Sequence, residues 1–307
     1  MNLNKYFTPI FLAIPVTWAG SFIAAKYVVQ SIEPIESVFF RFFLSAFVML
    51  PFLLIFKRGN HPNFLQPNFL KHLLIVVLTA GIGYHIFFFA ALKHTSPTNT
   101  ALIIAMNPFF TAIGEKFLNK ENRSNRFYIG FFMSFAGALW VIISRGSDGF
   151  VIPGKGELFC LIASLFWSAY TILSKYTKEE KWDSYWIGAY NYLFTALLII
   201  PFSVNILSFE YWQNISTVAW SGIWYMAIFP TAVGYTLFYV GIQKKGPAWA
   251  AAFIYLVPSM TANLDLIFFG ADFTFSMVLG TTIVVAGLFV GNLSQLQIEK
   301  VKKYFIY

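Results

Sequence analysis

The amino-acid sequence predicts an all-α polytopic membrane protein, with ten transmembrane helices in two inverted-topology five-helix repeats. Three observations predict this fold class. Hydrophobic residues make up 58% of the 307 residues and charged residues only 11%, whereas soluble domains carry about 25% charged residues. The apolar runs are long enough to cross a bilayer. Finally, the two halves of the chain match each other at an offset of about 150 residues.

The predicted spans follow from the length of the apolar runs. A helix needs about 20 mostly apolar residues to cross the hydrocarbon core. Ten segments meet this requirement, at residues 8–30, 35–56, 72–92, 97–118, 126–144, 156–175, 184–206, 217–242, 247–269 and 274–295. The runs are continuous rather than alternating, which favours helices over barrel strands. The first segment is too long for the core of a signal peptide, so we expect it to remain as a helix.

The basic residues predict the direction in which the chain crosses the membrane. If the N-terminus is cytoplasmic, 16 of the 21 Lys and Arg residues lie inside and only Lys93, Arg145 and Lys155 lie outside. Lys26 and Arg41 remain, and both lie within spans. Because basic residues accumulate in cytoplasmic loops, we expect both termini in the cytoplasm and, for so compact a chain, a bacterial inner (plasma) membrane. The net charge of +8 therefore reflects orientation and not nucleic-acid binding.

The internal repeat predicts two units, residues 1–148 with the first five spans and residues 149–307 with the last five. An odd number of spans makes the second unit enter the membrane in the opposite direction. Residues that recur in both units include Trp18 and Trp167, Lys26 and Lys175, and the pairs Gly83-Tyr84 and Gly234-Tyr235. The glycine-rich loop at 146–156 joins the two units.

A further recurring pattern consists of a proline, six residues, an acidic residue and then two glycines seven positions apart. It is formed by Pro108, Glu115, Gly130 and Gly137, and again by Pro258, Asp265, Gly280 and Gly287. With the ten short spans, this pattern resembles the EamA family of the drug/metabolite transporter superfamily. The resemblance covers nearly the whole chain and implies a secondary transporter, since such members export amino acids, related metabolites or drugs, and some import. The second unit departs from the pattern at Asp265, where Glu is expected, and at Asn191, the counterpart of Arg41.

Polar residues inside membrane helices are costly and normally face the interior of the bundle. We expect such residues to line a central cavity near the midplane, an arrangement that the resemblance also implies. The candidate substrate-binding residues are Trp18, Ser21, Tyr84, Asn107, Trp167, Tyr235, Tyr255 and Ser259. Aromatic walls with a few hydrogen-bonding groups suit small amphipathic solutes, including zwitterions whose ammonium lies over an aromatic face. The alternative is that the hydroxyl side chains only hydrogen-bond between helices, which is common in membranes.

Four charged residues are candidates for gating or coupling, namely Lys26, Arg41, Asp265 and Glu115. The first three are expected near the outer side, where an ion-pair cluster with Glu33 and Glu36 would close the outer gate. Glu115 is expected at the inner end of its span, beside Lys116 and Lys120, as part of an inner gate. The alternative is ordinary snorkelling of long side chains at helix ends. Protons are a candidate coupling ion, through Glu115, Asp265 or His85.

Backbone features predict where the helices bend and where they approach each other. Pro108 and Pro258 interrupt backbone hydrogen bonds within spans and are candidate hinges. Gly287 and Gly291 allow close helix packing, either with the fifth span or with a second copy in a homodimer. A Gly-x-x-x-x-Gly-Lys run at 149–155 lacks the Ser or Thr that a nucleotide-binding loop requires, and no metal-binding motif is present.

The predicted function is secondary transport of a small metabolite, such as an amino acid or related compound, by alternating access, with export as the expected direction. The same fold also carries drug-like solutes, sugar phosphates and nucleotide sugars. The anionic solutes would need several cavity cations, of which the sequence offers Lys26, Arg41 and Lys175. The sequence is also compatible, less readily, with a channel or an intramembrane enzyme. We expect no enzymatic activity and no cofactor or metal, and the expected partners are the solute and the lipid bilayer, with the protein a monomer or homodimer.

Overall fold

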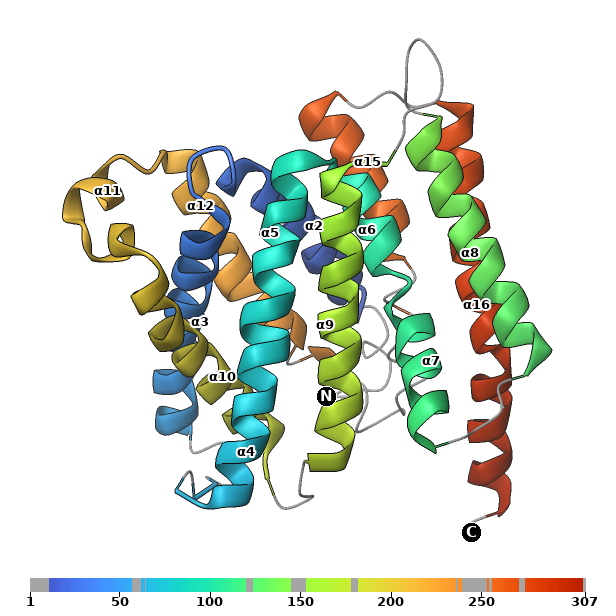
Figure 1. Cartoon of the computed structure of the whole chain (residues 1–307), viewed down its shortest axis with the longest axis horizontal. Coiled ribbons are helices and arrows are strands. Elements are labelled where there is room, and N and C mark those ends of the chain that lie inside the picture. The colour runs from blue at the N-terminus through green and yellow to red at the C-terminus, as the bar shows by residue number, and fades with distance from the viewer. Residues whose placement is uncertain are drawn as a thin grey trace, which may run out of the picture.

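The computed structural model describes residues 11–56, 62–63, 65–119, 124–144, 153–177, 182–235, 237–238, 253, 256–270 and 274–305. These residues form a bundle of helices and contain no strand (Figure 1). Five helices in the described part are long and apolar enough to cross a membrane, at Pro34–Phe56, Pro67–His94, Asn125–Ile143, Lys155–Ser174 and Tyr185–Phe202. The predicted all-helical membrane fold is therefore confirmed, and the count of ten spans stays a prediction.

The first half of the chain builds helices α2 to α8. They are α2 (Ala13–Val28), α3 (Pro34–Phe56), α4 (Pro67–Val76), α5 (Tyr84–His94), α6 (Pro97–Ile104), α7 (Asn107–Asn119) and α8 (Asn125–Ile143). A π-helical segment, η1 (Val77–Gly83), joins α4 to α5. The fourth predicted span is divided between α6 and α7, because Pro108 has no N–H to continue the backbone hydrogen bonds across the break.

The second half builds helices α9 to α16. They are α9 (Lys155–Thr177), α10 (Ser184–Ile199), α11 (Phe209–Gln213), α12 (Thr217–Met226), α15 (Val257–Phe269) and α16 (Phe275–Phe305). Two 3-10 segments, η2 (Ile200–Phe202) and η3 (Val204–Leu207), lie between α10 and α11, and a second π-helical segment, η4 (Ala227–Gly234), follows α12. Pro258 stands in the first turn of α15, as Pro108 stands in the first turn of α7. Both prolines therefore begin helices, and their role as hinges stays a prediction.

The two π-helical segments occupy equivalent places in the two halves. They begin at residues 77 and 227, which is an offset of 150, and each ends at a glycine followed by a tyrosine. In η4, Pro230 has no N–H to donate to the carbonyl of Met226, and the hydroxyl of Thr231 donates to that carbonyl instead, at 2.7 Å. Since π-helical turns are frequent at functional sites, this correspondence directs attention to the residues that follow them.

Helices α8 and α16 pack along each other at one side of the bundle (Figure 1). A Cβ atom added to Gly137 would lie 2.7 Å from the carbonyl oxygen of Gly280, and one added to Gly287 would lie 2.7 Å from that of Gly130. These four residues are the glycines that recur in the two halves. Helix α16 therefore packs against α8, which is one of the two alternatives that the sequence left open, and glycine is required for the close approach.

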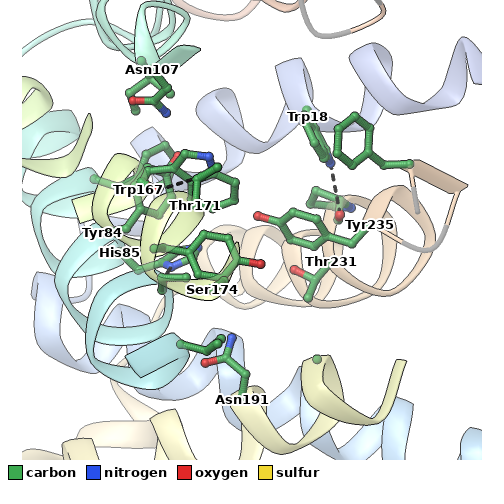
Figure 2. Close-up of a pocket in the computed structure, with 18 of the residues that line it drawn as sticks. Trp18, Tyr84, His85, Asn107, Trp167, Thr171, Ser174, Asn191, Thr231 and Tyr235 are labelled. Carbon is green, nitrogen blue, oxygen red and sulfur yellow. Dashed lines mark hydrogen bonds between the residues drawn. The ribbon is translucent and has the colours of Figure 1, made fainter. Parts of the chain in front are cut away.

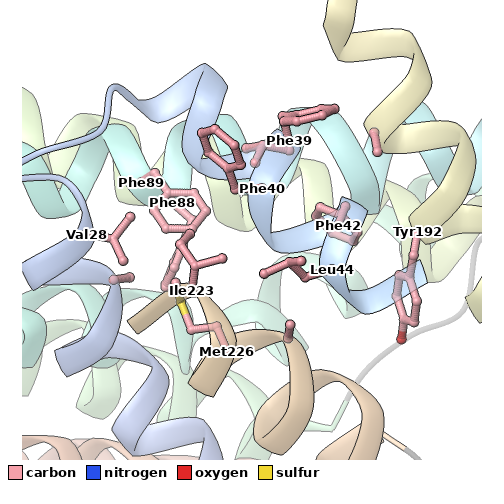
Figure 3. Packing of buried hydrophobic residues seen from close by; sticks show 14 of the residues in the cluster. Val28, Phe39, Phe40, Phe42, Leu44, Phe88, Phe89, Tyr192, Ile223 and Met226 are labelled. Carbon is pink, nitrogen blue, oxygen red and sulfur yellow. The ribbon is translucent and has the colours of Figure 1, made fainter. Parts of the chain in front are cut away.

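The core of the bundle is largely aromatic and aliphatic. Figure 3 shows Phe39, Phe40, Phe88 and Phe89 packed with aliphatic side chains from neighbouring helices. Large apolar side chains also cover the outside, where Phe47, Ile55, Phe117 and Phe132 are each more than half exposed. Such a surface suits a hydrocarbon solvent and not water.

Candidate functional site

A cavity of about 660 Å³ lies between helices from both halves of the chain (Figure 2). Its walls include residues from each of the helices α2 to α10, from the π-helical segments η1 and η4, and from the first turn of α15. This volume is within the range of pockets that hold small organic molecules, which is about 300–1,000 Å³. The cavity is open, because Thr171 of α9 lines it and is also exposed.

Most of the predicted substrate-binding residues meet at this cavity. Those that line it are Trp18, Ser21, Tyr84, Asn107, Trp167 and Tyr235. Ser259 does not line it and instead faces a shallow groove with Thr282 and Phe289. Tyr255 lies outside the described residues. The structure therefore brings together six of the eight predicted side chains.

The aromatic wall is built from pairs that cross between the two halves. The ring of Trp18 lies 5.4 Å from that of Tyr235, and the ring of Trp167 lies 4.9 Å from that of Tyr84, both with an interplanar angle of 57°. Trp167 and Tyr235 then stack at 6.4 Å. Each tryptophan thus contacts the tyrosine of the other half, and the two contacts join into one continuous wall (Figure 2).

The position of Trp18 is set by backbone features of η4. Its indole Nε1 donates to the carbonyl of Pro230 at 3.2 Å. A Cβ atom on Gly234 would lie 2.7 Å from that same nitrogen, so only glycine leaves room for the ring. The recurring glycine before each tyrosine is therefore explained, at Gly234, by the approach of the indole.

Arg41 lies in the cavity wall and not in the expected outer ion-pair cluster. Its side chain is only 4% exposed. Nη2 donates to the hydroxyl of Thr231 at 3.3 Å, Nη1 lies 3.9 Å from the sulfur of Met226, and Nε is buried with no hydrogen-bond partner. Among the described residues, no carboxylate lies within ion-pair distance of this guanidinium. The sequence-based placement was wrong because hydropathy gives the depth of a residue only roughly and does not give the direction of its side chain.

The counterpart of Arg41 in the second half also lines the cavity. Asn191 lies on α10, and its Oδ1 accepts a hydrogen bond from Thr195 at 3.2 Å. Helices α3 and α10 pack against each other, so both halves contribute a polar side chain from equivalent positions. One of these side chains is a cation and the other a neutral amide, so the two halves differ in charge at this position.

Glu115 and His85, the two other titratable candidates from the sequence that line the cavity, lie in different parts of its wall. Glu115 lies in the cavity wall toward the end of α7. His85 also lines the cavity, with Nδ1 at 2.7 Å from the carbonyl oxygen of Ala80 and its ring edge-on to Tyr84 and Phe42. His85 is therefore a packed and hydrogen-bonded side chain, and its role in proton coupling stays a prediction.

Polar side chains close one end of the bundle, where α5 ends and α6 begins. Nζ of Lys26 donates to the carbonyls of Leu92 at 2.7 Å and Thr95 at 3.0 Å. Oδ2 of Asp265 accepts from the backbone N–H of Thr98 at 3.1 Å and from its hydroxyl. The turn between α5 and α6 is therefore held by α2 and α15.

A third contact to the same turn comes from α9. Oε1 of Glu157 accepts hydrogen bonds from the hydroxyl of Thr95 and, at 3.1 Å, from Nδ2 of Asn99. Together, the residues of these three contacts form what we call the polar seal, namely Lys26, Thr95, Thr98, Asn99, Glu157 and Asp265. Sequence analysis named only Lys26 and Asp265, and the cluster of Thr98 and Asn99 at the start of a span was the signal it did not use.

The prediction that Lys26, Arg41 and Asp265 form an outer ion-pair cluster with Glu33 and Glu36 was wrong, because the described contacts of Lys26 and Asp265 are the hydrogen bonds of the polar seal. Lys26 binds carbonyl oxygens, and Glu36 accepts from Ser203 and Asn205. The ion pair found in the described part of the chain joins Lys93 and Glu33 at 2.6 Å, at an exposed position. Hydrogen bonds to backbone carbonyls and from side-chain hydroxyl and amide groups satisfy these polar side chains.

The cavity extends from the middle of the bundle toward the opposite end. Its lining includes Glu115 near the end of α7, Ser174 near the end of α9 and His72 in α4. These parts of the helices lie at the end of the bundle away from the polar seal (Figure 1). In the described residues, no group of three or more His, Cys, Asp or Glu side chains is placed to hold a metal ion. The lining of the cavity supplies aromatic faces, hydrogen-bonding side chains and the charged side chains of Arg41 and Glu115.

Comparison with known proteins shows that both halves of the chain are similar to one family. Residues 8–143 and 154–293 each match the EamA-like transporter family. The transporter YyaM of Bacillus subtilis is 30% identical over 297 residues, which cover 95% of this chain and 94% of that protein. A transporter of Archaeoglobus fulgidus is 27% identical over 300 residues, which cover 94% of this chain and 99% of that protein.

One solved crystal structure is also similar over its full length. It matches with a TM-score of 0.64 and 19% sequence identity, and the match covers 96% of this chain and 99% of the other. At this level of identity the similarity concerns the fold alone.

Proposed function

Because the chain belongs to the EamA-like transporter family, we propose that it is a secondary transporter that moves a small metabolite, an amino acid or related compound, across the bacterial plasma membrane. The observation that carries this proposal is the cavity wall formed by Trp18, Tyr235, Trp167 and Tyr84. Each half supplies one tryptophan and one tyrosine to it. A site shared in this way changes whenever one half moves relative to the other, as transport requires.

The proposal includes ten spans in two inverted repeats, with both termini in the cytoplasm. Two features of the structure support the repeat. The π-helical segments lie at an offset of 150 residues, and the recurring glycines of α8 and α16 contact each other in matched pairs. The distribution of 16 inner and 3 outer basic residues supports the orientation. In this orientation the polar seal lies on the outer side.

The difference between the two ends of the bundle supports alternating access as the proposed mechanism. The cavity reaches toward the cytoplasmic end, so a solute enters from there, which fits export. The outer end must then open by separation of the polar seal, while the inner end closes near Glu115. Pro108 and Pro258, each in the first turn of its helix, are the proposed hinges, and protons are the proposed coupling ion.

Sugar phosphates and nucleotide sugars fit the site less well. A doubly charged phosphate group calls for several cations in its pocket. Arg41 is the cation among the described residues that line the cavity, since Lys26 is bound within the polar seal. The side chain of Lys175 lies outside the described residues. The site therefore favours solutes with a small net charge.

Counterflow in proteoliposomes tests the proposal. Labelled amino acids with aromatic, aliphatic and small polar side chains are offered to vesicles preloaded with the unlabelled compound, with and without a pH gradient. We expect saturable exchange by the wild-type protein that is lost in Trp18→Ala. Trp140→Ala is the matched control, because Trp140 of α8 is 42% exposed and does not line the cavity. The absence of exchange by folded wild-type protein for every solute would contradict the proposal.

A further inference from the structure

The charge of Arg41 needs a partner that the described residues do not supply. Removing a guanidinium from water costs several kcal/mol unless an anion or a full set of hydrogen bonds compensates it. Arginine has five N–H donors. At Arg41 the described contacts are the hydroxyl of Thr231 and the sulfur of Met226, and Nε has no partner. The guanidinium therefore keeps unused donors in a buried position.

The guanidinium is also held in one orientation. Thr231 donates its own hydroxyl hydrogen to the carbonyl of Met226, and therefore its oxygen is free to accept from Nη2 of Arg41. That carbonyl is available because residue 230 is a proline. The π-helical segment η4 thus creates the acceptor that fixes one edge of the guanidinium.

The cavity is where a compensating anion has room to bind. Arg41 lines it together with Tyr84, Tyr192 and Tyr235, whose hydroxyls are additional hydrogen-bond donors. The corresponding position in the other half is the neutral Asn191, so only one of these two equivalent positions carries a positive charge. A planar guanidinium with adjacent free donors matches a carboxylate, which accepts two parallel hydrogen bonds.

We infer that Arg41 binds the carboxylate of the transported solute, so that carboxylate-bearing compounds are the substrate class of this protein. The inference rests on the proposed function and names the group that the site recognises. A single cation suits a single negative charge, and the aromatic wall provides faces for an apolar side chain or for the ammonium of a zwitterion. Arg41 is thus a specificity-determining residue and not part of an outer gate.

Binding of matched acids and amides tests the inference. The purified protein in nanodiscs is titrated with phenylalanine, leucine and 3-phenylpropionate, and with the primary amide of each, while tryptophan fluorescence is recorded, since Trp18 and Trp167 line the cavity. We expect each acid to bind about 30-fold more tightly than its amide, the loss typical when a buried charge pair is broken. The pair made from 3-phenylpropionate isolates the carboxylate, because neither member carries an ammonium.

Variants separate recognition from a structural role of the arginine. In Arg41→Gln the acids should lose their advantage over the amides, while binding of the amides persists. Arg41→Lys keeps the charge without the planar fork, so a reduced preference for acids should remain. Arg126→Gln is the control, because Arg126 is exposed at the start of α8 and lies outside the cavity. A purely structural role would weaken acids and amides equally.

Counterflow of the same compounds distinguishes the two proposals. Acids that bind but are not exchanged would overturn the proposed transport and leave the inference standing. Amides that bind and exchange as well as acids, with Arg41→Gln unaffected, would overturn the inference and leave transport standing. Failure of every acid and amide to bind the folded wild-type protein would overturn both.

Discussion

At the scale of single residues, the geometry of the site depends on a glycine without a Cβ atom and a proline without an N–H group, as well as on the side chains that line the cavity. Gly234 lacks a Cβ where Trp18 approaches, and Pro230 lacks an N–H where Thr231 binds the backbone. Each omission sets the position of a cavity side chain on the opposite half. The aromatic wall and the guanidinium of Arg41 are therefore arranged by the backbone of η4.

Substitution of Gly234 tests how tightly the indole is positioned. In Gly234→Ala the new methyl group would lie 2.7 Å from Nε1 of Trp18 and 3.1 Å from the hydroxyl of Thr17. Because overpacking typically costs about 1–3 kcal/mol, we expect the affinity for exchanged solutes to fall about tenfold, measured by fluorescence titration. Gly154→Ala is the control, since its nearest neighbour would be 3.8 Å away. Equal affinities for both variants would disprove the positional role.

The seal can be probed through the single cysteine of the chain. Cys160 is fully buried on α9, one turn after Glu157 of the seal. In Asp265→Asn the acceptor for Thr98 loses its charge, and a charged hydrogen bond contributes about 1.5–3 kcal/mol. We expect labelling of Cys160 by a membrane-impermeant maleimide to become about tenfold faster. Glu210→Gln is the control, because it removes an exposed carboxylate from α11 and should leave the labelling rate unchanged. If Asp265→Asn also left the labelling rate unchanged, Asp265 would not hold the seal.

At the scale of the elements, α8 and α16 are in close contact along their lengths. Four recurring glycines allow their backbones to meet, and Ser134 of α8 donates to the carbonyl of Val284 at 3.1 Å. The contact buries the two predicted terminal spans of the halves against each other. The pair therefore links the two halves of the chain.

A larger side chain at the contact between α8 and α16 should destabilise the protein. Gly137→Leu places a side chain against the backbone of Gly280, and we expect a loss of about 1–3 kcal/mol or more from overpacking. Thermal unfolding in detergent measures the change as a lower Tm. Ala136→Leu introduces the same side chain at the neighbouring exposed position and should leave the Tm nearly unchanged. If both variants had the same Tm as the wild-type protein, the glycine contact would not be required for stability.

Sequence reasoning identified the apolar helices, the repeat and six of the cavity residues, because hydropathy and residue spacing report these features directly. It did not predict the division into α6 and α7 or the π-helical segments, since both depend on which backbone groups find partners after packing. It misplaced Arg41 for a related reason. The sequence gives the depth of a residue along a helix only roughly, and the partners of the Arg41 side chain are Thr231 and Met226, 190 and 185 positions away.

At the scale of the whole molecule, each half completes the site of the other. Trp18 contacts Tyr235, Trp167 contacts Tyr84, and Arg41 contacts Thr231. The polar seal likewise joins α6 of the first half to α9 and α15 of the second. A relative movement of the halves must therefore alter the cavity and the seal together. This coupling is the physical basis that we propose for alternating access.

The most direct measurement of this claim is the accessibility of a cavity residue from both sides of the membrane. In a Cys160→Ser background, Ser21→Cys places a thiol in the cavity wall, and a membrane-impermeant thiol reagent is applied to either side of oriented vesicles. The account predicts labelling from both sides and protection from both by an exchanged acid. Labelling from the cytoplasmic side alone, under every solute gradient, would contradict it.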